Sequence, residues 1–247
     1  MRRRQTALRP GAVPAAFDGA AASYDALVAA DPGYHRHLRA SARRMGLPGN
    51  GARLRVLDAG CGTGASTEAV LNAAPLAQVV AVDASEQMLR RARRKTWPPS
   101  VRFAHCRVED LSSAGEDGPF DAVFAAYLVR NLDDPDGQLR AFRRLLRPGG
   151  RLVLHEFSVR DSVRARAVWN LVCWAIIIPA GTAASGSSAL YRYLWRSVRS
   201  FDGVERFQRR LLDCGFTDVE TRTMSGWQRR VVHTFLARTP SGNTTDA

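Results

Sequence analysis

Cysteine is scarce in this chain, and its spacing excludes several kinds of site. The 247 residues include four cysteines, Cys61, Cys106, Cys173 and Cys214, and none of them forms a Cys-x-x-Cys pair. This spacing argues against a disulfide framework, a redox motif and a metal site. We therefore expect no bound metal and a reducing, cytoplasmic location.

Long apolar runs are also lacking. Residues 1–16 are basic but have no apolar core of the kind that a signal peptide carries, so we interpret them as a disordered basic arm. The uncharged stretch from Ala167 to Tyr191 has only one strongly apolar part, Leu171 to Ile178, and a membrane span needs roughly 20 such residues. We interpret about 160–201 as a cap, which either touches the inner face of a membrane, is buried, or joins two copies as a homodimer.

Acidic residues are outnumbered by basic ones. There are 23 Asp and Glu against 36 Lys and Arg, a formal net charge of +13. A positive surface of this size is typical of proteins that bind nucleic acid or an anionic membrane. It is equally compatible with solvated faces that simply favour arginine.

Strand and helix patterns alternate from Arg53 to Ser158, which indicates a parallel α/β sheet. Ser85 is expected to cap a helix, Pro148-Gly149-Gly150 to end one, and Gly215 to follow another. We expect one domain over 17–240, with residues 241–247 as a disordered tail. The expected strands are 54–59, 79–83, 101–108, 120–127, 151–157, 217–224 and 231–237, and the expected helices are 66–74, 85–95, 136–147 and 204–214.

A glycine-rich turn carries the chemistry. Gly60, Gly62 and Gly64 follow the first strand, and glycine lets the backbone turn tightly and approach a ligand. Asp83 ends the next strand, where a carboxylate can accept hydrogen bonds from both ribose hydroxyls. The spacing differs from the Gly-x-Gly-x-x-Gly of dinucleotide-binding turns, and Asp58 before it suits a ligand that has an amino group and no phosphate. S-adenosylmethionine (SAM) is such a ligand, which makes it the expected cofactor.

These motifs resemble those of class I SAM-dependent methyltransferases, and further segments resemble the ubiquinone/menaquinone biosynthesis C-methyltransferase family. The resemblance spans about 17–237 and implies a Rossmann-like fold: a mostly parallel seven-stranded sheet with helices on both faces and a helical cap. The segments that carry it are Phe17-Asp18, Tyr24-Asp25, Asp58 to Gly64, Asp83, Arg130-Asn131, Arg144 to Ser158, Tyr191 to Leu194, and Cys214-Gly215-Phe216.

The turn and the resemblance together imply a set of cofactor-binding residues. Arg107 and Val108 stand where the family tends to have Asp or Asn followed by Ala, near the adenine, and Ala126 stands where the family has Ser. The expected cofactor-binding residues are Tyr24, Asp58, Gly60, Gly62, Thr63, Gly64, Asp83, Ala84, Met88, Arg107, Val108, Glu109 and Ala126.

Three residues are catalytic candidates. His155 lies near the end of the fifth strand and is the first candidate for the base that deprotonates a phenol; the alternative is a half-exposed strand histidine. Arg130 could stabilise a phenolate or order a water, or form an ordinary salt bridge. Tyr127 either lies over the methyl donor or belongs to the core. The expected substrate pocket comprises Asn131, Trp174, Tyr191 and Tyr193. The alternative for the tyrosines is aromatic packing within the cap.

The resemblance implies C-methylation of a prenylated quinol such as demethylmenaquinol, or of a related lipophilic aromatic. Three other functions remain open. One is methylation of a different small molecule or natural product. Another is methylation of nucleic acid, against which Tyr127 to Asn131 lacks the Asn/Asp-Pro-Pro-aromatic motif of amino-group enzymes. The last is a SAM-fold protein that transfers no methyl group.

Overall fold

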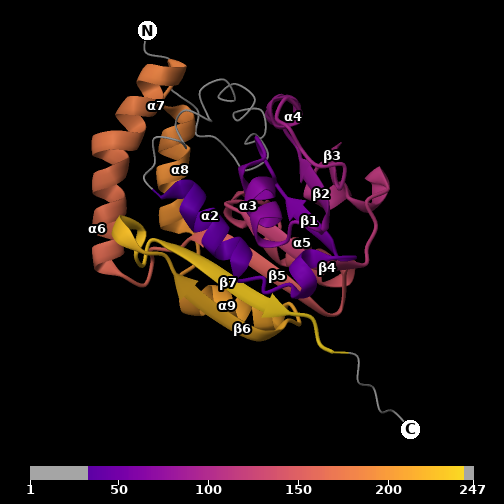
Figure 1. Cartoon of the computed structure of the whole chain (residues 1–247). Coiled ribbons are helices and arrows are strands. Elements are labelled where there is room, and N and C mark those ends of the chain that lie inside the picture. Colours follow the sequence, from indigo (N-terminus) through magenta and orange to yellow (C-terminus); the bar gives the residue numbers. More distant parts are fainter. Residues whose placement is uncertain (1–32, 242–247) are drawn as a thin grey trace.

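Seven strands form one sheet through the middle of the molecule (Figure 1). The computed structural model describes residues 33–241. The strand order is β3-β2-β1-β4-β5-β7-β6; β1 to β5 are parallel, and β7 is antiparallel to both of its neighbours. This confirms the expected mostly parallel α/β fold. The strands are β1 (Arg55–Ala59), β2 (Gln78–Asp83), β3 (Val101–His105), β4 (Phe120–Ala126), β5 (Leu146–Phe157), β6 (Thr217–Thr223) and β7 (Val232–Arg238).

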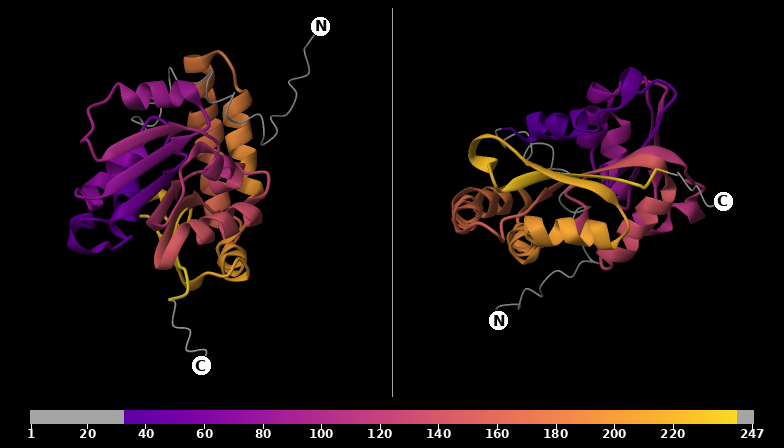
Figure 2. Two further views of the ribbon diagram at one scale, coloured as in Figure 1. Left: turned by 90° about the vertical axis from the view of Figure 1, so that its right-hand side faces the viewer. Right: turned by 90° about the horizontal axis from the view of Figure 1, so that it is seen from below.

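Helices cover both faces of the sheet (Figure 2). Leu38 of α2 and Val70 of α3 pack with Val56 on one face, whereas Phe142 of α5 packs in the core of the other face with Leu57. Val56 and Leu57 belong to different cores because successive strand residues point to opposite faces. The helices are α2 (Tyr34–Arg43), α3 (Ala65–Ala73), α4 (Glu86–Arg93), α5 (Pro135–Leu145), α6 (Val163–Val172), α7 (Ile178–Ser185), α8 (Ala189–Ser200) and α9 (Val204–Asp213).

Local sequence signals set several helix ends. The Ser85 hydroxyl accepts a hydrogen bond from the Met88 backbone N–H at 3.2 Å and starts α4, as expected. The Asp134 side chain caps α5 in the same way, through the Gly137 N–H. Gly215 follows α9 with φ +87°, a conformation that glycine adopts without a steric penalty.

Two expected boundaries were wrong. Helix α5 ends at Leu145, and Pro148-Gly149-Gly150 lies inside β5 instead of stopping the helix. This segment joins the strand because its backbone is paired: the Gly149 N–H donates to the Pro240 carbonyl at 3.2 Å, while Gly149 itself takes a φ of +71°. The third strand ends at His105, since the chain turns into the 3-10 helix Val108–Asp110.

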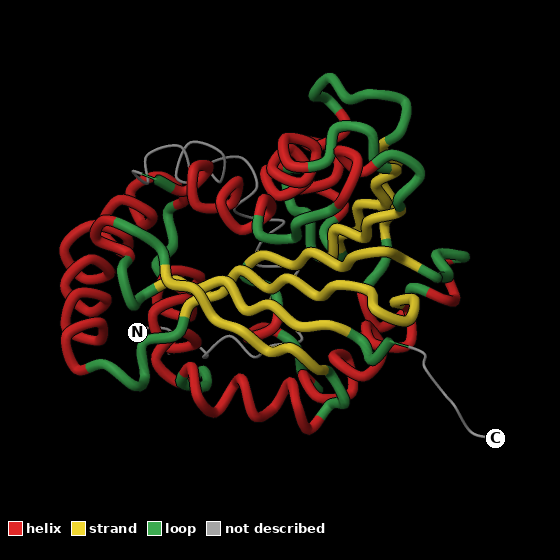
Figure 3. The backbone as a smooth tube through the Cα atoms, turned by 60° about the horizontal axis from the view of Figure 1, so that its bottom comes forward, coloured by secondary structure: helices red, strands yellow, loops and turns green. Residues whose placement is uncertain are grey.

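The expected cap consists of α6, α7 and α8, which stand beside one end of the sheet (Figure 3). A π-helical turn, Cys173–Ile177, joins α6 to α7, so Val163–Ser185 forms a helical segment of 23 residues. The expectation considered only the apolar part from Leu171 to Ile178, whereas the continuous helical segment around it is long enough to span a membrane. Pro179 does not end the helix because it lies in the first turn of α7, directly after the π turn. By length and composition alone, the segment could cross a membrane.

Some expectations fall outside the described residues. They are the basic arm 1–16, Phe17-Asp18, Tyr24-Asp25 and nearly all of the tail 241–247. The expected cofactor contact of Tyr24 and the domain limits therefore stay predictions.

Candidate active site

The glycine turn after β1 has the backbone that only glycine adopts readily. Gly60, Gly62 and Gly64 have φ values of +73°, +55° and +92°. A Cβ on Gly64 would lie 2.7 Å from the Trp97 ring, and one on Gly60 would lie 3.0 Å from Leu128. At Gly62, by contrast, no atom of residues 33–241 outside the turn itself lies within 4 Å of the Cβ position. The middle glycine thus borders open space over the turn, while the outer two are needed for packing.

Asp83 connects this turn to the end of β2. Its carboxylate accepts hydrogen bonds from the backbone N–H of Gly62 and of Ser85, both at 2.8 Å. Strands β1 and β2 are parallel neighbours, so their carboxyl ends meet at one edge of the sheet, which is where ligands bind in open α/β folds. Ala84 lies at the same edge, and Met88 is buried in the first turn of α4.

Asp58 is fully buried beneath the turn. One carboxyl oxygen accepts from the hydroxyls of Ser66 at 2.8 Å and Thr67 at 2.6 Å, which ties the start of α3 to β1. The other oxygen, Oδ1, has no hydrogen-bond partner among the described residues. Burial raises the pKa of Asp58 to about 7, since a low-dielectric environment disfavours the charged form. The unpartnered oxygen suits a ligand that brings a hydrogen-bond donor.

The other expected cofactor residues surround this edge. The Cys106 N–H donates to the Asp83 carbonyl at 3.2 Å, which places the loop after β3 beside the turn. In that loop the half-exposed Arg107 side chain pairs with Glu109 at 3.3 Å. The Thr63 carbonyl accepts from Lys95 Nζ at 2.7 Å, and this lysine was not expected near the site. Val108 is buried, and Ala126 ends β4 beside His155 of β5.

Tyr127 has a strained backbone at the end of β4. Its φ of +56° is uncommon for a residue other than glycine and is typical of functional sites. Surrounding groups hold it there: its N–H donates to the His155 carbonyl at 2.7 Å, and its carbonyl accepts from Arg130 and Asn131, both at 2.9 Å. Its ring packs against Phe157 with centroids 4.7 Å apart.

Arg130 and Glu156 form a buried ion pair next to Tyr127, with Nη1 and Oε1 2.6 Å apart and side chains 5% and 1% exposed. Burial raises the pKa of Glu156, and the Arg130 guanidinium opposes that rise. Arg130 Nε and Glu156 Oε2 have no hydrogen-bond partner within residues 33–241. The salt bridge considered from the sequence is thus present, and its two unpartnered atoms suit a ligand or water site, because buried polar atoms without partners are rare elsewhere.

Comparison with known families shows which family the chain belongs to. The model of the ubiE/COQ5 methyltransferase family matches residues 5–233. The chain belongs to this family. It is similar to the demethylmenaquinone methyltransferase of Clavibacter sepedonicus, with 33% identity over 91% of this chain and 90% of the relative. It is also similar to the demethylmenaquinone methyltransferase of Thermus thermophilus, with 33% identity over 73% and 82% of the two chains.

Solved structures support the fold. The [4+2]-cyclase SpnF superposes with a TM-score of 0.70 at 18% identity, covering 96% of this chain and 98% of that one. A methyltransferase of Haloferax volcanii, solved with its activator Trm112, gives 0.66 at 17% identity over 91% and 97%. At these identities the likeness shows the fold alone, and family membership is what makes the protein a methyltransferase.

The methyltransferase uses S-adenosylmethionine as its cofactor. Two features of the described residues fit that cofactor. Open space lies over Gly62, and the Oδ1 atom of Asp58 is buried without a partner. We expect Asp83 to meet the ribose, as the sequence predicted; the individual contacts stay predictions.

His155 lies near the end of β5, as expected, but in a different environment. The side chain is fully buried, and both ring nitrogens are bonded to hydroxyls: Nδ1 to Ser41 at 2.7 Å and Nε2 to Tyr127 at 2.9 Å. Burial lowers its pKa to about 3. The half-exposed alternative was therefore wrong, and a base in direct contact with an acceptor does not fit this burial. Among the described residues, His155 would act on an acceptor through Tyr127.

The expected substrate pocket is divided between two environments. The Tyr193 hydroxyl donates to Asn131 Oδ1 at 3.1 Å, which joins α8 to the Tyr127 and Arg130 region. Tyr191 packs inside the cap, where a Cβ on Gly181 would lie 2.4 Å from its ring. Trp174 is 47% exposed and packs on Trp195 at the outer face of the cap, and its place in a substrate pocket stays a prediction.

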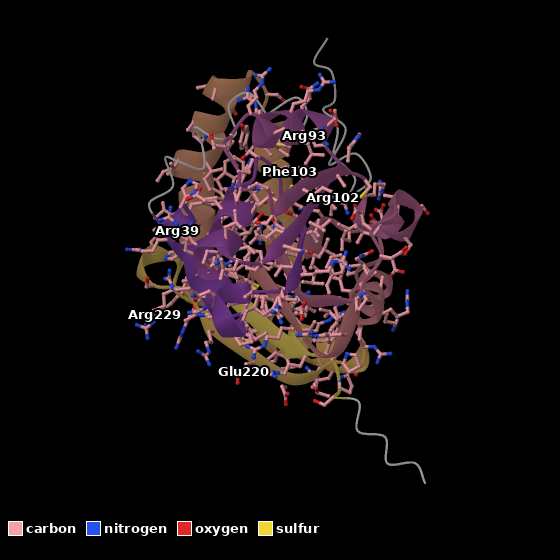
Figure 4. All side chains as sticks on the ribbon, turned by 45° about the vertical axis from the view of Figure 1, so that its right-hand side comes forward. Arg39, Arg93, Arg102, Phe103, Glu220 and Arg229 are labelled. Carbon is pink, nitrogen blue, oxygen red and sulfur yellow. The ribbon has the colours of Figure 1, made fainter. Side chains whose placement is uncertain are left out.

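Basic side chains on several elements have acidic partners. Arg39, Arg93 and Arg102, labelled in Figure 4, come from α2, α4 and β3 and are 43%, 42% and 60% exposed. Their partners are Glu68, Glu86 and Glu116. These three pairs neutralise part of the basic surface of the described residues.

Proposed function

We propose that this methyltransferase transfers the methyl group of SAM to a ring carbon of a prenylated quinol, with demethylmenaquinol as the first candidate. One observation carries the proposal: the polar cluster of Tyr127, Arg130, Asn131 and Glu156 lies at the ends of β4 and β5, and the apolar cap adjoins it through Tyr193. Strand β4 is also the neighbour of β1, which bears the glycine turn. The names of the similar proteins from Clavibacter sepedonicus and Thermus thermophilus support the same acceptor.

SAM supplies an electrophilic methyl group when bound. The residues of the chain then have three tasks: to align the acceptor carbon, to favour its ionised oxygen and to exclude water. Alignment by the turn and the cap supplies a large share of such an acceleration. Arg130 is fixed by Glu156, so its positive charge is preorganised for a phenolate without reorganisation during the reaction. The apolar cap keeps the surroundings dry, which strengthens these interactions.

The test is methyl transfer from SAM labelled in its methyl group to demethylmenaquinol in detergent or vesicles. We expect label in the reduced acceptor and none in the oxidised quinone, which has no phenol to ionise. Carbon NMR of the product separates a ring methyl group from a methoxy group. The matched control is Asp83→Ala, which should weaken cofactor binding about 10- to 100-fold and lower labelling accordingly when SAM is limiting. Labelling of RNA or of small soluble phenols, with none in any prenylated aromatic, would overturn the proposal.

We also propose that the outer face of the cap docks on an anionic membrane, where such an acceptor resides. Leu171, Trp174 and Ile176 on this face are 69%, 47% and 60% exposed. Arg192 lies over the Trp174 ring at 5.5 Å, so a cationic group accompanies the apolar one, as at a membrane interface. Near an anionic surface each such arginine contributes about 1 kcal/mol.

Vesicle flotation tests this docking surface. We expect binding to vesicles with anionic lipid, weakening with salt, and little binding to neutral vesicles. The variant Leu171→Ser/Ile176→Ser should bind less. The control is Leu76→Ser, which changes a leucine that is also 60% exposed but lies outside the cap, between α3 and β2. It should bind as the wild type does. Resistance to extraction at high pH would instead indicate a spanning helix, and a dimer that dissociates in the cap variant would indicate an interface; either result contradicts the proposal.

A further inference from the structure

A chain of hydrogen bonds runs from Arg44 to the phenol of Tyr127. Arg44 Nη1 donates to Thr234 Oγ1 at 2.6 Å, and Thr234 Oγ1 lies 2.6 Å from Ser41 Oγ. Ser41 Oγ is 2.7 Å from His155 Nδ1, and His155 Nε2 is 2.9 Å from the Tyr127 hydroxyl. The five residues come from α2, β5, β7 and the segments that follow α2 and β4. Ser41, His155 and Thr234 are completely buried.

The donors and acceptors give this chain a direction. Arg44 can only donate, so Thr234 accepts from it. The Thr234 proton then has one acceptor among the described residues, Ser41, and the Ser41 proton in turn has His155 Nδ1. Since Nδ1 accepts, the ring proton lies on Nε2 and is donated to Tyr127. The reverse direction would leave the Thr234 proton without an acceptor in residues 33–241, which is costly in a buried site.

The imidazole ring of His155 is uncharged in this arrangement. His155 is fully buried and its pKa is lowered to about 3, mainly by burial, so the ring is neutral at physiological pH. A neutral ring with the proton on Nε2 transmits polarisation from the guanidinium of Arg44 towards the phenol. Successive hydrogen bonds of this kind strengthen one another in a low-dielectric interior.

We propose that Arg44, Thr234, Ser41 and His155 are positioning residues that orient and polarise the Tyr127 hydroxyl as a hydrogen-bond donor to the acceptor oxygen. The inference rests on the proposed function, since it assumes an acceptor that reacts as a phenolate. Tyr127 accepts a bond from His155, and a hydroxyl that accepts a hydrogen bond donates more strongly in turn. The left-handed backbone of Tyr127 is consistent with a side chain held in one orientation.

The rival interpretation is that the chain only ties α2 to the sheet. Nitrogen NMR of the ¹⁵N-labelled protein first tests the direction of the chain without any acceptor, because protonated and unprotonated ring nitrogens have different shifts; kinetic measurements then separate the two interpretations. We expect His155 to be neutral with its proton on Nε2, and Ser41→Ala to perturb the Nδ1 signal. A proton on Nδ1 in the wild type overturns the inference.

Kinetics tests the effect on Tyr127. Thr234→Val removes one hydroxyl at nearly constant volume, and Thr239→Val is the matched control, since Thr239 is a buried threonine just after β7 whose hydroxyl bonds the Arg147 carbonyl. We expect Thr234→Val to lower kcat about 3- to 10-fold, as for one lost hydrogen bond. The acceptor KM and SAM affinity should change less than about twofold in either variant, and Thr239→Val should keep the wild-type kcat.

A double-mutant cycle completes the test. Tyr127→Phe alone should lower kcat by about 10²-fold, the lower range for loss of a preorganised donor. In that background Thr234→Val should have almost no further effect, because the hydroxyl it polarises is gone. Equal losses in both backgrounds, or a comparable loss in Thr239→Val, contradict the inference while the proposed function stands. A wild type that methylates no prenylated quinol refutes the proposed function, and with it the role of Tyr127, whatever the tautomer of His155. Ser41→Ala serves in place of Thr234→Val if the latter does not fold.

Discussion

Asp58→Asn is expected to make the methyltransferase more stable at alkaline pH and a weaker binder of SAM. The carboxyl group is fully buried, and burial raises its pKa from the ordinary 3.8 to about 7. Between these two values the folded protein holds a proton that the unfolded chain has released. Stability therefore falls as the pH rises from about 4 to about 7, and the loss then levels off.

The magnitude follows from the size of this shift. Each pKa unit corresponds to about 1.4 kcal/mol, so the shift destabilises the ionised form by as much as about 4 kcal/mol at pH 8. Asparagine removes the titration and still offers an oxygen to Ser66 and Thr67. Its NH₂ group would lack an acceptor among the described residues, which offsets about 1–3 kcal/mol of the gain at every pH. This offset is the same at pH 5 and pH 8, so it cancels when the two pH values are compared. Between them the wild type should lose about 3 kcal/mol of unfolding free energy relative to the variant.

Urea unfolding of the cofactor-free protein at both pH values measures this difference, and calorimetry with SAM measures the affinity. If Asp58 Oδ1 meets a donor of the cofactor, the affinity of Asp58→Asn should fall by about 1.5–3 kcal/mol. The control is Asp121→Asn, which changes a buried carboxylate at the other end of the sheet that accepts from the Arg55 N–H at 2.7 Å. It should leave SAM affinity unchanged. If the free energy of unfolding changes between pH 5 and pH 8 by the same amount in the wild type and in Asp58→Asn, the reasoning about burial is refuted. An unchanged SAM affinity in Asp58→Asn would refute the assigned contact.

Three further predictions concern single positions. Asp83→Ala should weaken SAM binding by about 1.5–3 kcal/mol in calorimetry, because a charged acceptor at the cofactor edge is lost; an unchanged affinity in the folded variant contradicts this. Arg130→Met should destabilise the protein by about 3–5 kcal/mol in urea, since it leaves Glu156 buried without its partner. The double variant Arg130→Met/Glu156→Leu should recover part of that loss. A double variant that is less stable than the single variant would contradict this prediction. Gly181→Ala should lower the melting temperature, because its Cβ would meet the Tyr191 ring. At Gly186 no described residue other than its chain neighbours lies within 4 Å of a Cβ, so Gly186→Ser should have a smaller effect that reflects only its φ of +70°. Equal shifts would show that α7 and α8 do not pack so closely.

Much of the cofactor edge could be predicted from the sequence. The turn of Gly60, Gly62 and Gly64, the carboxylate of Asp83 and the cap at Ser85 all lie within a short stretch of chain. Their positions follow from local rules: a strand that ends in glycines, a second strand of the same direction and a helix that begins with a capping hydroxyl. Such rules act between near neighbours, so no knowledge of distant contacts was needed.

The acceptor side could not be predicted to the same degree. The bond between Ser41 and Thr234 joins residues 193 positions apart, and neither showed any signal in the sequence. The outward face of Trp174 and the continuity of α6 with α7 likewise depend on packing.

The sequence by itself determined the seven strands, the helices α3, α4, α5 and α9, the glycine turn and the family, because periodicity, capping and motif spacing are local properties of the chain; helix α2 was not expected. Only the tertiary structure decided the environments of the side chains. Burial between α2, β5 and β7 encloses His155 and joins it to Ser41 by a hydrogen bond, which its position in the sequence did not indicate. The same packing brought Arg130 and Glu156 together as a buried ion pair. A pKa and a hydrogen-bond partner depend on which distant segments exclude water from a side chain, and that is settled only when those segments pack together.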